Sequence, residues 1–220
     1  MKRLFLFIAL FSTAWAIKAQ SIGNYHMQWE TTIGLNVSNL GGLGSRTGFH
    51  IGARAEFPLL SLADRSTYLN TGVLLSLKGC SQDYGNWGSA KVNPYYLDVP
   101  IHFGYKHAIT RVVSVFAEGG PYVGIGLFGK SKIQKPANLE GSTPEEYDTN
   151  IFTERGLKRF DFGLGFRIGA ELWQRYSVSL GYDWGLINQY RQSESIESEH
   201  FHQTSNLKNR NLTISLSYKF

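Results

Sequence analysis

Charged residues recur at every second position of several apolar segments, and residues of these types could conduct ions or pair with one another. The set consists of Arg54, Glu56, Asp98, Glu118, Arg167, Glu171 and Asp183, with Lys78, Lys106, Asp161 and Lys219. An unpaired charge that is removed from water costs several kcal/mol. Because the two signs nearly cancel, we interpret the set as a structural charge network that fills an enclosed interior. A small conduction path is the alternative.

A second group of potentially reactive residues lies in a polar stretch. His200 and His202 stand close to Ser198, Glu197 and Glu199. A hydrolase needs a nucleophile and a base within hydrogen-bond reach, and zinc sites have ligand spacings more specific than H-x-H with scattered glutamates. The stretch has neither signature, so we expect a solvated loop. The sequence therefore predicts no catalytic residue, no metal site and no cofactor.

The elements that carry the charged residues alternate strictly between apolar and polar positions, which is typical of β-strands. Eight such segments occur, at residues 29–38, 48–57, 68–78, 95–106, 113–128, 160–172, 176–185 and 211–220. Their number and their length of about ten residues match the smallest outer-membrane barrels. The sequence thus predicts an all-β fold, an eight-stranded antiparallel up-and-down transmembrane β-barrel.

The connections between these segments support the same fold. They cover residues 39–46, 58–67, 79–93, 107–111, 128–158, 173–175 and 187–209. The long ones fall on alternate connections, and such barrels have long outer loops and short periplasmic turns. Pro100 and Pro121 count against two of the strands, because proline removes a ladder donor. We expect local bulges to accommodate them.

The apolar face is expected to meet lipid rather than a soluble interior. A soluble barrel would carry many charges on its outer face, whereas the polar face here is rich in the small residues that suit a narrow lumen. Aromatic residues of the apolar face gather towards strand ends, as rings do at membrane interfaces. These residues are Tyr95, Tyr105, Phe160, Tyr176, Trp184, Tyr218 and Phe220.

The first residues form a separate unit. A basic start is followed by an apolar run and by Ala14, Ala16 and Ala19, the layout of a cleaved secretory signal. We expect a signal peptide over residues 1–19 and the barrel domain over 20–220, with cleavage after Ala16 or Ala19. Without the signal, 19 basic residues remain against 17 acidic ones. This balance gives no reason to expect nucleic acid as a partner.

Several segments together resemble the PorT-like outer-membrane β-barrel proteins of Bacteroidetes. They are "YYLDVPIHFGYK", "FAEGGPYVGIGL", "FDFGLGFRIGAEL", "SVSLGYDWGLIN" and "LKNRNLTISLSYKF". The resemblance implies an eight-stranded barrel in the outer membrane, and the founding member is associated with a protein secretion system. The ending with Tyr218 and Phe220 also resembles the signal that bacterial barrels present to their assembly machinery.

These observations lead to a functional hypothesis. We expect a non-enzymatic integral outer-membrane protein with a filled lumen and a structural or interaction role through its extracellular loops, which includes an accessory part in protein secretion. The partners expected are outer-membrane lipids and lipopolysaccharide, the barrel assembly machinery, and secretion-system or surface proteins. A lipid-modifying enzyme and a small channel are the alternatives.

Overall fold

A computed structural model gives the arrangement of the chain and describes residues 27–41, 43–62, 65–83, 89–134, 147–152, 157–189 and 207–220. The strands are β1 (Gln28–Leu40), β2 (Gly44–Ser61), β3 (Arg65–Leu77), β4 (Cys80–Asp83), β5 (Ser89–Ala108), β6 (Val113–Gln134), β7 (Tyr147–Asn150), β8 (Phe160–Leu172), β9 (Tyr176–Gly185) and β10 (Asn209–Lys219). The expected signal peptide, residues 1–19, and the loop that carries His200 and His202 lie outside the described residues. No helix in the described ranges is long and apolar enough to cross a bilayer.

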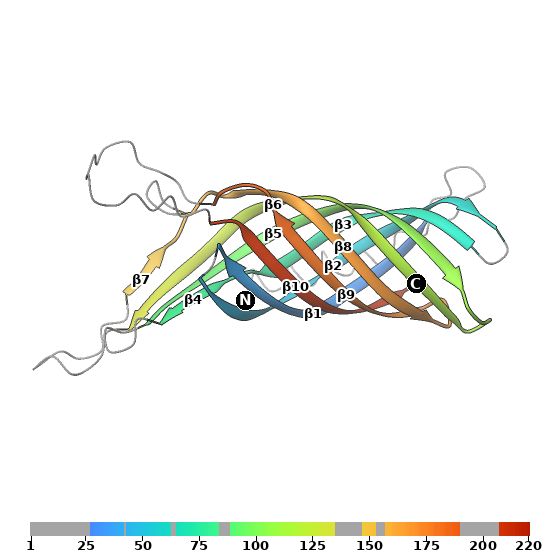
Figure 1. Cartoon of the computed structure of the whole chain (residues 1–220), viewed down its shortest axis with the longest axis horizontal. Coiled ribbons are helices and arrows are strands. Elements are labelled where there is room, and N and C mark those ends of the chain that lie inside the picture. The colour runs from blue at the N-terminus through green and yellow to red at the C-terminus, as the bar shows by residue number, and fades with distance from the viewer. Residues whose placement is uncertain are drawn as a thin grey trace, which may run out of the picture.

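The strands form one closed antiparallel ring (Figure 1). The eight long strands β1, β2, β3, β5, β6, β8, β9 and β10 each pair with the next long strand in the chain, and β1 pairs with β10 from Glu30↔Lys219 to Leu40↔Asn209. Two short strands share a place in the ring with a long one. The strand β4 comes after β3 in the chain and, like β3, pairs with β2 and β5, and β7 comes before β8 and, like β8, pairs with β6. Among the described residues the ring therefore has eight positions, which confirms the predicted eight-stranded barrel.

The two faces of the strands are as the alternation predicted. Along β10, Leu212, Ile214 and Leu216 are about half exposed on the outside, whereas Thr213 and Ser215 are buried in the lumen. A closed ring pairs every backbone group without a sheet edge, as a structure surrounded by hydrocarbon requires. The apolar exterior and the polar interior follow from this one constraint and the two-residue period of a strand.

The ends of the barrel differ, and we name them by their connections. Residues 109–112 and 173–175 join strands at the short-turn end, where β10 also finishes (Figure 1). The opposite end, which we call the long-loop end, carries β4 and β7. Outward rings mark both ends. At the short-turn end, successive ring centroids of Trp173, Tyr176, Tyr218 and Phe220 lie 5.2–6.3 Å apart.

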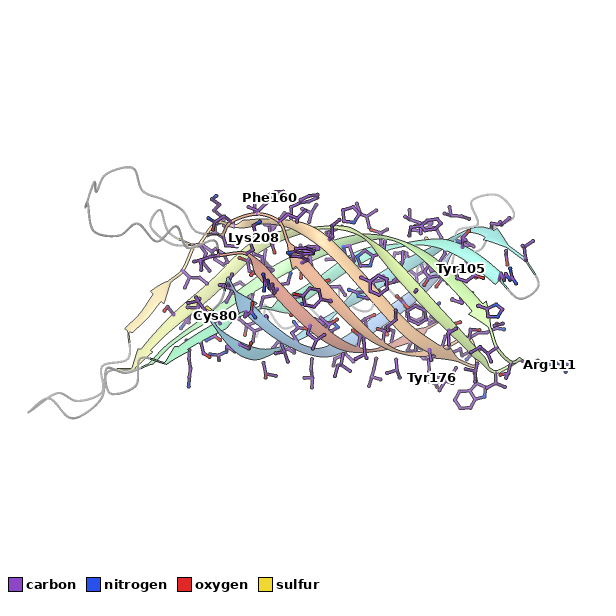
Figure 2. All side chains as sticks on the ribbon, in the orientation of Figure 1. Cys80, Tyr105, Arg111, Phe160, Tyr176 and Lys208 are labelled. Carbon is purple, nitrogen blue, oxygen red and sulfur yellow. The ribbon has the colours of Figure 1, made fainter. Side chains whose placement is uncertain are left out.

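At the long-loop end the ring of Tyr95 lies 4.7 Å from that of Phe128 and 6.4 Å from that of Phe49, between centroids. Figure 2 shows Phe160 towards this same end, and Tyr105 and Tyr176 towards the other. The two groups of outward aromatic rings thus bound an apolar band, as expected for a barrel that crosses a membrane.

Two expectations about irregular segments are wrong. The predicted connections 79–93 and 128–158 contain β4, β7, the start of β5 and the end of β6, so the sheet continues beyond the aromatic rings at the long-loop end. Backbone pairing there does not require an apolar face, so alternation of residue types does not reveal it. The chain also shows no register shift at either proline.

The register of the ladder is the same on both sides of Pro100 and Pro121, while shifts occur at Pro58/Leu60 and Tyr95/Tyr96. The prolines are accommodated by missing ladder pairs instead of bulges. The β3–β5 ladder omits the pairs at Val99 and Pro100, and the β5–β6 ladder omits those at Ile101 and His102. A backbone position that makes no ladder hydrogen bond loses none to proline.

Candidate functional site

The lumen contains three groups of ionisable side chains, most of them buried, which are stacked along the barrel. The lower quartet, near the short-turn end, is Glu56, Lys106, Glu171 and Lys219. The central cluster is Glu30, Arg54, His102, Glu118 and Arg167. The upper cluster, towards the long-loop end, is Lys78, Asp98, Asp161 and Asp183. Every member belongs to the inward face of a strand or directly follows one.

The lower quartet comes from four strands, β2, β5, β8 and β10. The Lys106 Nζ lies 3.0 Å from a carboxylate oxygen of Glu56 and 3.0 Å from one of Glu171. Lys219 pairs with the same two carboxylates, 2.6 Å from that of Glu171. Two cations and two anions thus close a neutral ring that spans the lumen.

The central cluster is organised around Arg54. Its Nε lies 2.7 Å from Glu30 Oε1, and its Nη1 donates to Glu118 Oε1 at 2.8 Å. Arg167 Nη1 and His102 Nδ1 each lie 3.5 Å from the same Glu118 oxygen. Arg54 and Glu118 are each 2% exposed. Removal of either would leave buried charges without a counter-ion.

The upper cluster has one cation among three carboxylates. Lys78 donates to Asp98 at 2.9 Å, and its Nζ lies 3.9 Å from Asp161. Neutral donors supply the remaining contacts of Asp161, from Tyr122 at 3.2 Å, Gln189 at 2.8 Å and Asn209 at 2.7 Å. Hydrogen bonds thus offset part of the excess negative charge.

A family model for the outer membrane protein beta-barrel domain matches residues 19–191. The chain belongs to this family. The barrel is therefore an outer-membrane protein, and its long-loop end is the extracellular one, because outer-membrane barrels have short periplasmic turns. No curated protein matches the chain.

Several solved structures of outer-membrane barrels are similar to the chain. Neisserial surface protein A is 14% identical with a TM-score of 0.42, over 88% of this chain and 97% of that one. The attachment invasion locus protein Ail of Yersinia pestis, in complex with the heparin analogue sucrose octasulfate, is 14% identical with a TM-score of 0.38, over 88% and 99%. The N-terminal barrel of Pseudomonas aeruginosa OprF is 8% identical with a TM-score of 0.31, over 87% and 97%. These scores carry no argument about function.

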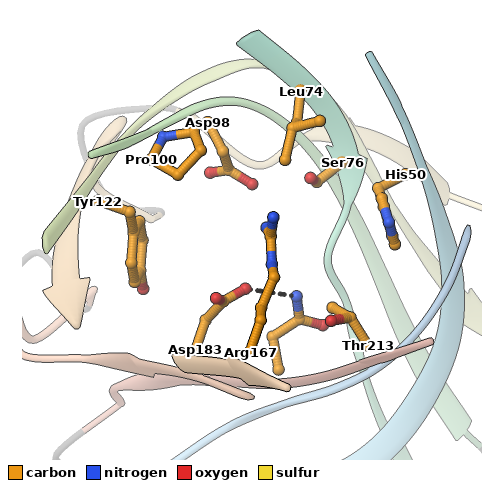
Figure 3. Close-up of a pocket in the computed structure, with 10 residues that line it drawn as sticks. His50, Leu74, Ser76, Asp98, Pro100, Tyr122, Arg167, Asp183 and Thr213 are labelled. Carbon is orange, nitrogen blue, oxygen red and sulfur yellow. Dashed lines mark hydrogen bonds between the residues drawn. The ribbon is translucent and has the colours of Figure 1, made fainter. Parts of the chain in front are cut away.

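A small cavity lies beside the upper cluster of the barrel. Asp98, Arg167 and Asp183 lie around it with His50 and Thr213 (Figure 3). The space suits about one water molecule, and the buried Nε of Arg167 and Oγ1 of Thr213 lack a protein partner there. The arrangement can hold a water between polar groups. No set of three or more His, Cys, Asp or Glu side chains in the described ranges is placed to hold a metal ion.

Apolar side chains cover the extracellular end of the lumen. Ile151 and Phe152, which follow β7, pack on Tyr96 in a buried cluster. The Arg159 guanidinium lies 5.1 Å from the centre of the Phe152 ring and donates to the carbonyls of Gly126 and Leu127, both at 2.9 Å. A Cβ at Gly126 would come within 2.4 Å of the Phe152 ring, so glycine is needed here for the ring to enter.

The inward face of the barrel also holds a trio of side chains that are hydrogen-bonded in the order of a hydrolytic triad. His50 Nε2 lies 2.9 Å from Ser215 Oγ, and His50 Nδ1 bonds to Asn36 Oδ1. All three residues are at most 3% exposed, and the ring of His50 lies against Gly34. The buried trio joins β1, β2 and β10 through these side-chain hydrogen bonds.

The seven charged residues singled out from the sequence all lie in the lumen groups, whereas Tyr218 and Phe220 lie on the outer surface. Sequence reasoning missed Glu30, although it is two residues before Thr32 and so shares its inward face. With Glu30, seven carboxylates face five lysines and arginines in the lumen. His50 and His102 were also missed, since alternation gives their face but not their partners.

Cys80 lies outside the lumen groups. It stands on β4, beyond the outer aromatic rings, and is 3% exposed. Burial raises the pKa of its thiol to about 11. The thiol is therefore protonated at neutral pH and acts as a small apolar side chain.

Proposed function

We propose that this outer-membrane barrel is a structural or interaction protein with a filled lumen, and that its contacts with other molecules are made at its extracellular end. The observation that carries the proposal is the set of ion pairs across the lumen. The lower quartet links four strands, and the central cluster joins β1, β2, β6 and β8 through Arg54, Glu118 and Arg167. Eight strands leave an interior just wide enough for side chains.

Pairing across the lumen favours this role over a channel. Ions that pass a barrel must enter a continuous aqueous path, whereas here Arg54 and Glu118 are buried against each other. Phe152 and Tyr96 add an apolar layer above them, with ring centroids 5.8 Å apart. We therefore expect no ion flow through the folded barrel.

Planar-bilayer recording tests this expectation. The purified barrel, once inserted, is expected to give no conductance above the background of the protein-free bilayer. Insertion is measured separately with fluorescently labelled protein, and a porin recorded in the same bilayer is the positive control. Stable single-channel steps from the inserted barrel would contradict the filled lumen and support the channel alternative.

We further propose that the chain is a PorT-like member of the barrel family and serves as an accessory to protein secretion. The support is the order of the quoted segments in strands β5, β6, β8, β9 and β10. Purification from native outer membranes distinguishes this role, because an accessory protein would be recovered with secretion-system components and a lone barrel would not.

The outward end of β10 is proposed as an assembly signal for the barrel assembly machinery. Phe220 is 57% exposed, and its ring stacks on that of Tyr218 with centroids 6.3 Å apart. The backbone N–H of Phe220 donates to Trp29 at 3.1 Å, which fixes the strand end beside β1. An apolar pair held in this way offers a defined surface for recognition.

Phe220→Ala is expected to reduce the amount of barrel in the outer membrane several-fold while the exported pool in the periplasm remains. The measurement is immunoblotting of separated membrane and periplasmic fractions. Phe103→Ala is the matched control, because Phe103 is equally exposed, at 56%, but lies on the outward face of β5 and not at the end of β10. Equal membrane levels for the two variants would remove the assembly role.

A further inference from the structure

Among the residues whose side chains the structure describes, the charges on the outside of the barrel are basic at both ends. All seven carboxylates whose side chains the structure describes face the lumen. The described charged residues outside the lumen at the extracellular rim are therefore basic, and Lys208 and Arg210 on the outward face of β10 belong to them. The basic residues at this rim have no described carboxylate beside them on the outer surface, so they can attract anions from the surrounding leaflet.

The register of β10 fixes the direction of Lys208 and Arg210. Arg210 is opposite Asn39 on β1 and Trp184 on β9. The N–H of Gly41 donates to the carbonyl of Lys208 at 3.0 Å, so the β1–β10 ladder continues by one more pair. Both cations therefore continue the outward face of Leu212, and their Cα atoms are about 7 Å apart along the strand.

Apolar side chains lie directly beneath and beside these cations. Trp184 is 53% exposed, Leu186 41% and Leu212 49%. The N–H of Leu186 donates to Phe162 on β8 at 2.8 Å, which keeps this part of the chain on the barrel wall. Figure 2 shows Lys208 at the same end of the barrel as Phe160. The patch thus joins a cationic upper part to a lipid-facing lower part.

Within the described residues Lys208 and Arg210 have no ion-pair partner, and both stand at the edge of the apolar band. A cation at this depth gains most from an anion fixed at the same depth, and arginine matches phosphate oxygens with two parallel hydrogen bonds. The lipid of the outer leaflet that offers such an anion above acyl chains is a phosphorylated glycolipid.

We propose that Lys208 and Arg210, with Trp184, Leu186 and Leu212, bind one phosphorylated and multiply acylated glycolipid of the lipid A type. The two cations contact a sugar phosphate, and the apolar residues contact its acyl chains. The proposal depends on the outer-membrane location and not on the role proposed above, so a failed conductance or assembly experiment leaves it unaffected.

The test uses the full barrel in nanodiscs of phosphatidylcholine, with purified diphosphorylated lipid A as the probe. Lipid retained by each barrel is counted by native mass spectrometry, and affinity is measured by titration. The test variant is Lys208→Gln with Arg210→Gln, and Arg210→Gln alone is the milder version. The matched control is Arg111→Gln with Arg175→Gln, two exposed arginines at the opposite end of the barrel.

The double substitution is expected to weaken lipid A binding about tenfold or more, since each cation near the anionic surface contributes about 1 kcal/mol. The single variant should lie in between, and the control pair should bind as the wild type does. Lipid A without phosphates should bind the wild-type barrel as weakly as the double variant binds the phosphorylated form. Unchanged binding by the double variant, equal loss in the control pair, or equal binding of phosphatidylglycerol would overturn the proposal.

Discussion

Replacement of Arg54 by methionine is expected to lower the free energy of unfolding of the barrel by about 3–5 kcal/mol, because it leaves buried carboxylates without their cation. Arg54 contacts Glu30 at 2.7 Å and Glu118 at 2.8 Å, inside a lumen that neither carboxylate can leave. Glu118 keeps Arg167, but Glu30 keeps only a hydrogen bond from Asn70 at 3.1 Å. Denaturant titration of the barrel in lipid vesicles, followed by tryptophan fluorescence, measures the loss.

A double variant separates the charge effect from the loss of packing. Arg54→Met with Glu30→Gln removes one cation and one anion together, so most of the stability should return. Arg175→Met changes an exposed arginine at a turn and should stay within about 0.5 kcal/mol of the wild type. If the single variant were as stable as this control, or if the double variant were no better than the single one, the central cluster would not contribute as we propose.

Much of the fold follows from the sequence because the two-residue alternation of apolar and polar side chains determines which face of each strand meets lipid. In β8, for example, each residue from Phe160 to Arg167 belongs to the face that alternation assigns, since a strand cannot place two successive side chains on one side. The same rule placed Arg167 and Asp161 in the lumen. A closed barrel adds no exception, because it has no edge strand at which the pattern could change.

The partners of these residues could not be predicted in the same way. Arg54 and Glu118 are 64 residues apart in the chain, and Lys219 and Glu56 are 163 apart. Which cation meets which carboxylate depends on the stagger of strands around the ring. A shift of two residues in one pairing keeps every side chain on its face and yet changes which side chains meet across that pairing. The His50 trio was hidden for the same reason.

The pairing between β1 and β10 is the last step that closes the ring. Side chains from the lumen cross this seam as well as the backbone ladder. Thr32 Oγ1 lies 2.8 Å from Ser217 Oγ, and His50 bonds to both Asn36 and Ser215. The side chains therefore fix one register at the seam, while the ladder supplies the pairing that hydrocarbon surroundings make obligatory.

Ile214 is at the centre of this seam, opposite Leu35 on β1 and Leu180 on β9. Its side chain is 52% exposed to lipid, so a change there disturbs little packing. Ile214→Pro is nevertheless expected to cost about 3 kcal/mol or more and to prevent most of the chain from reaching the closed form, because the residue can no longer donate in an uninterrupted ladder. Heat-dependent mobility on gels and the yield of membrane-inserted barrel measure the closed form.

The control variant Ile214→Ala keeps the backbone N–H and should fold normally. Pro121 shows the contrast within the same chain, since the ladder pair that it would make with Ile101 is already absent. A proline variant as stable as the alanine variant would mean that side chains alone hold the seam closed.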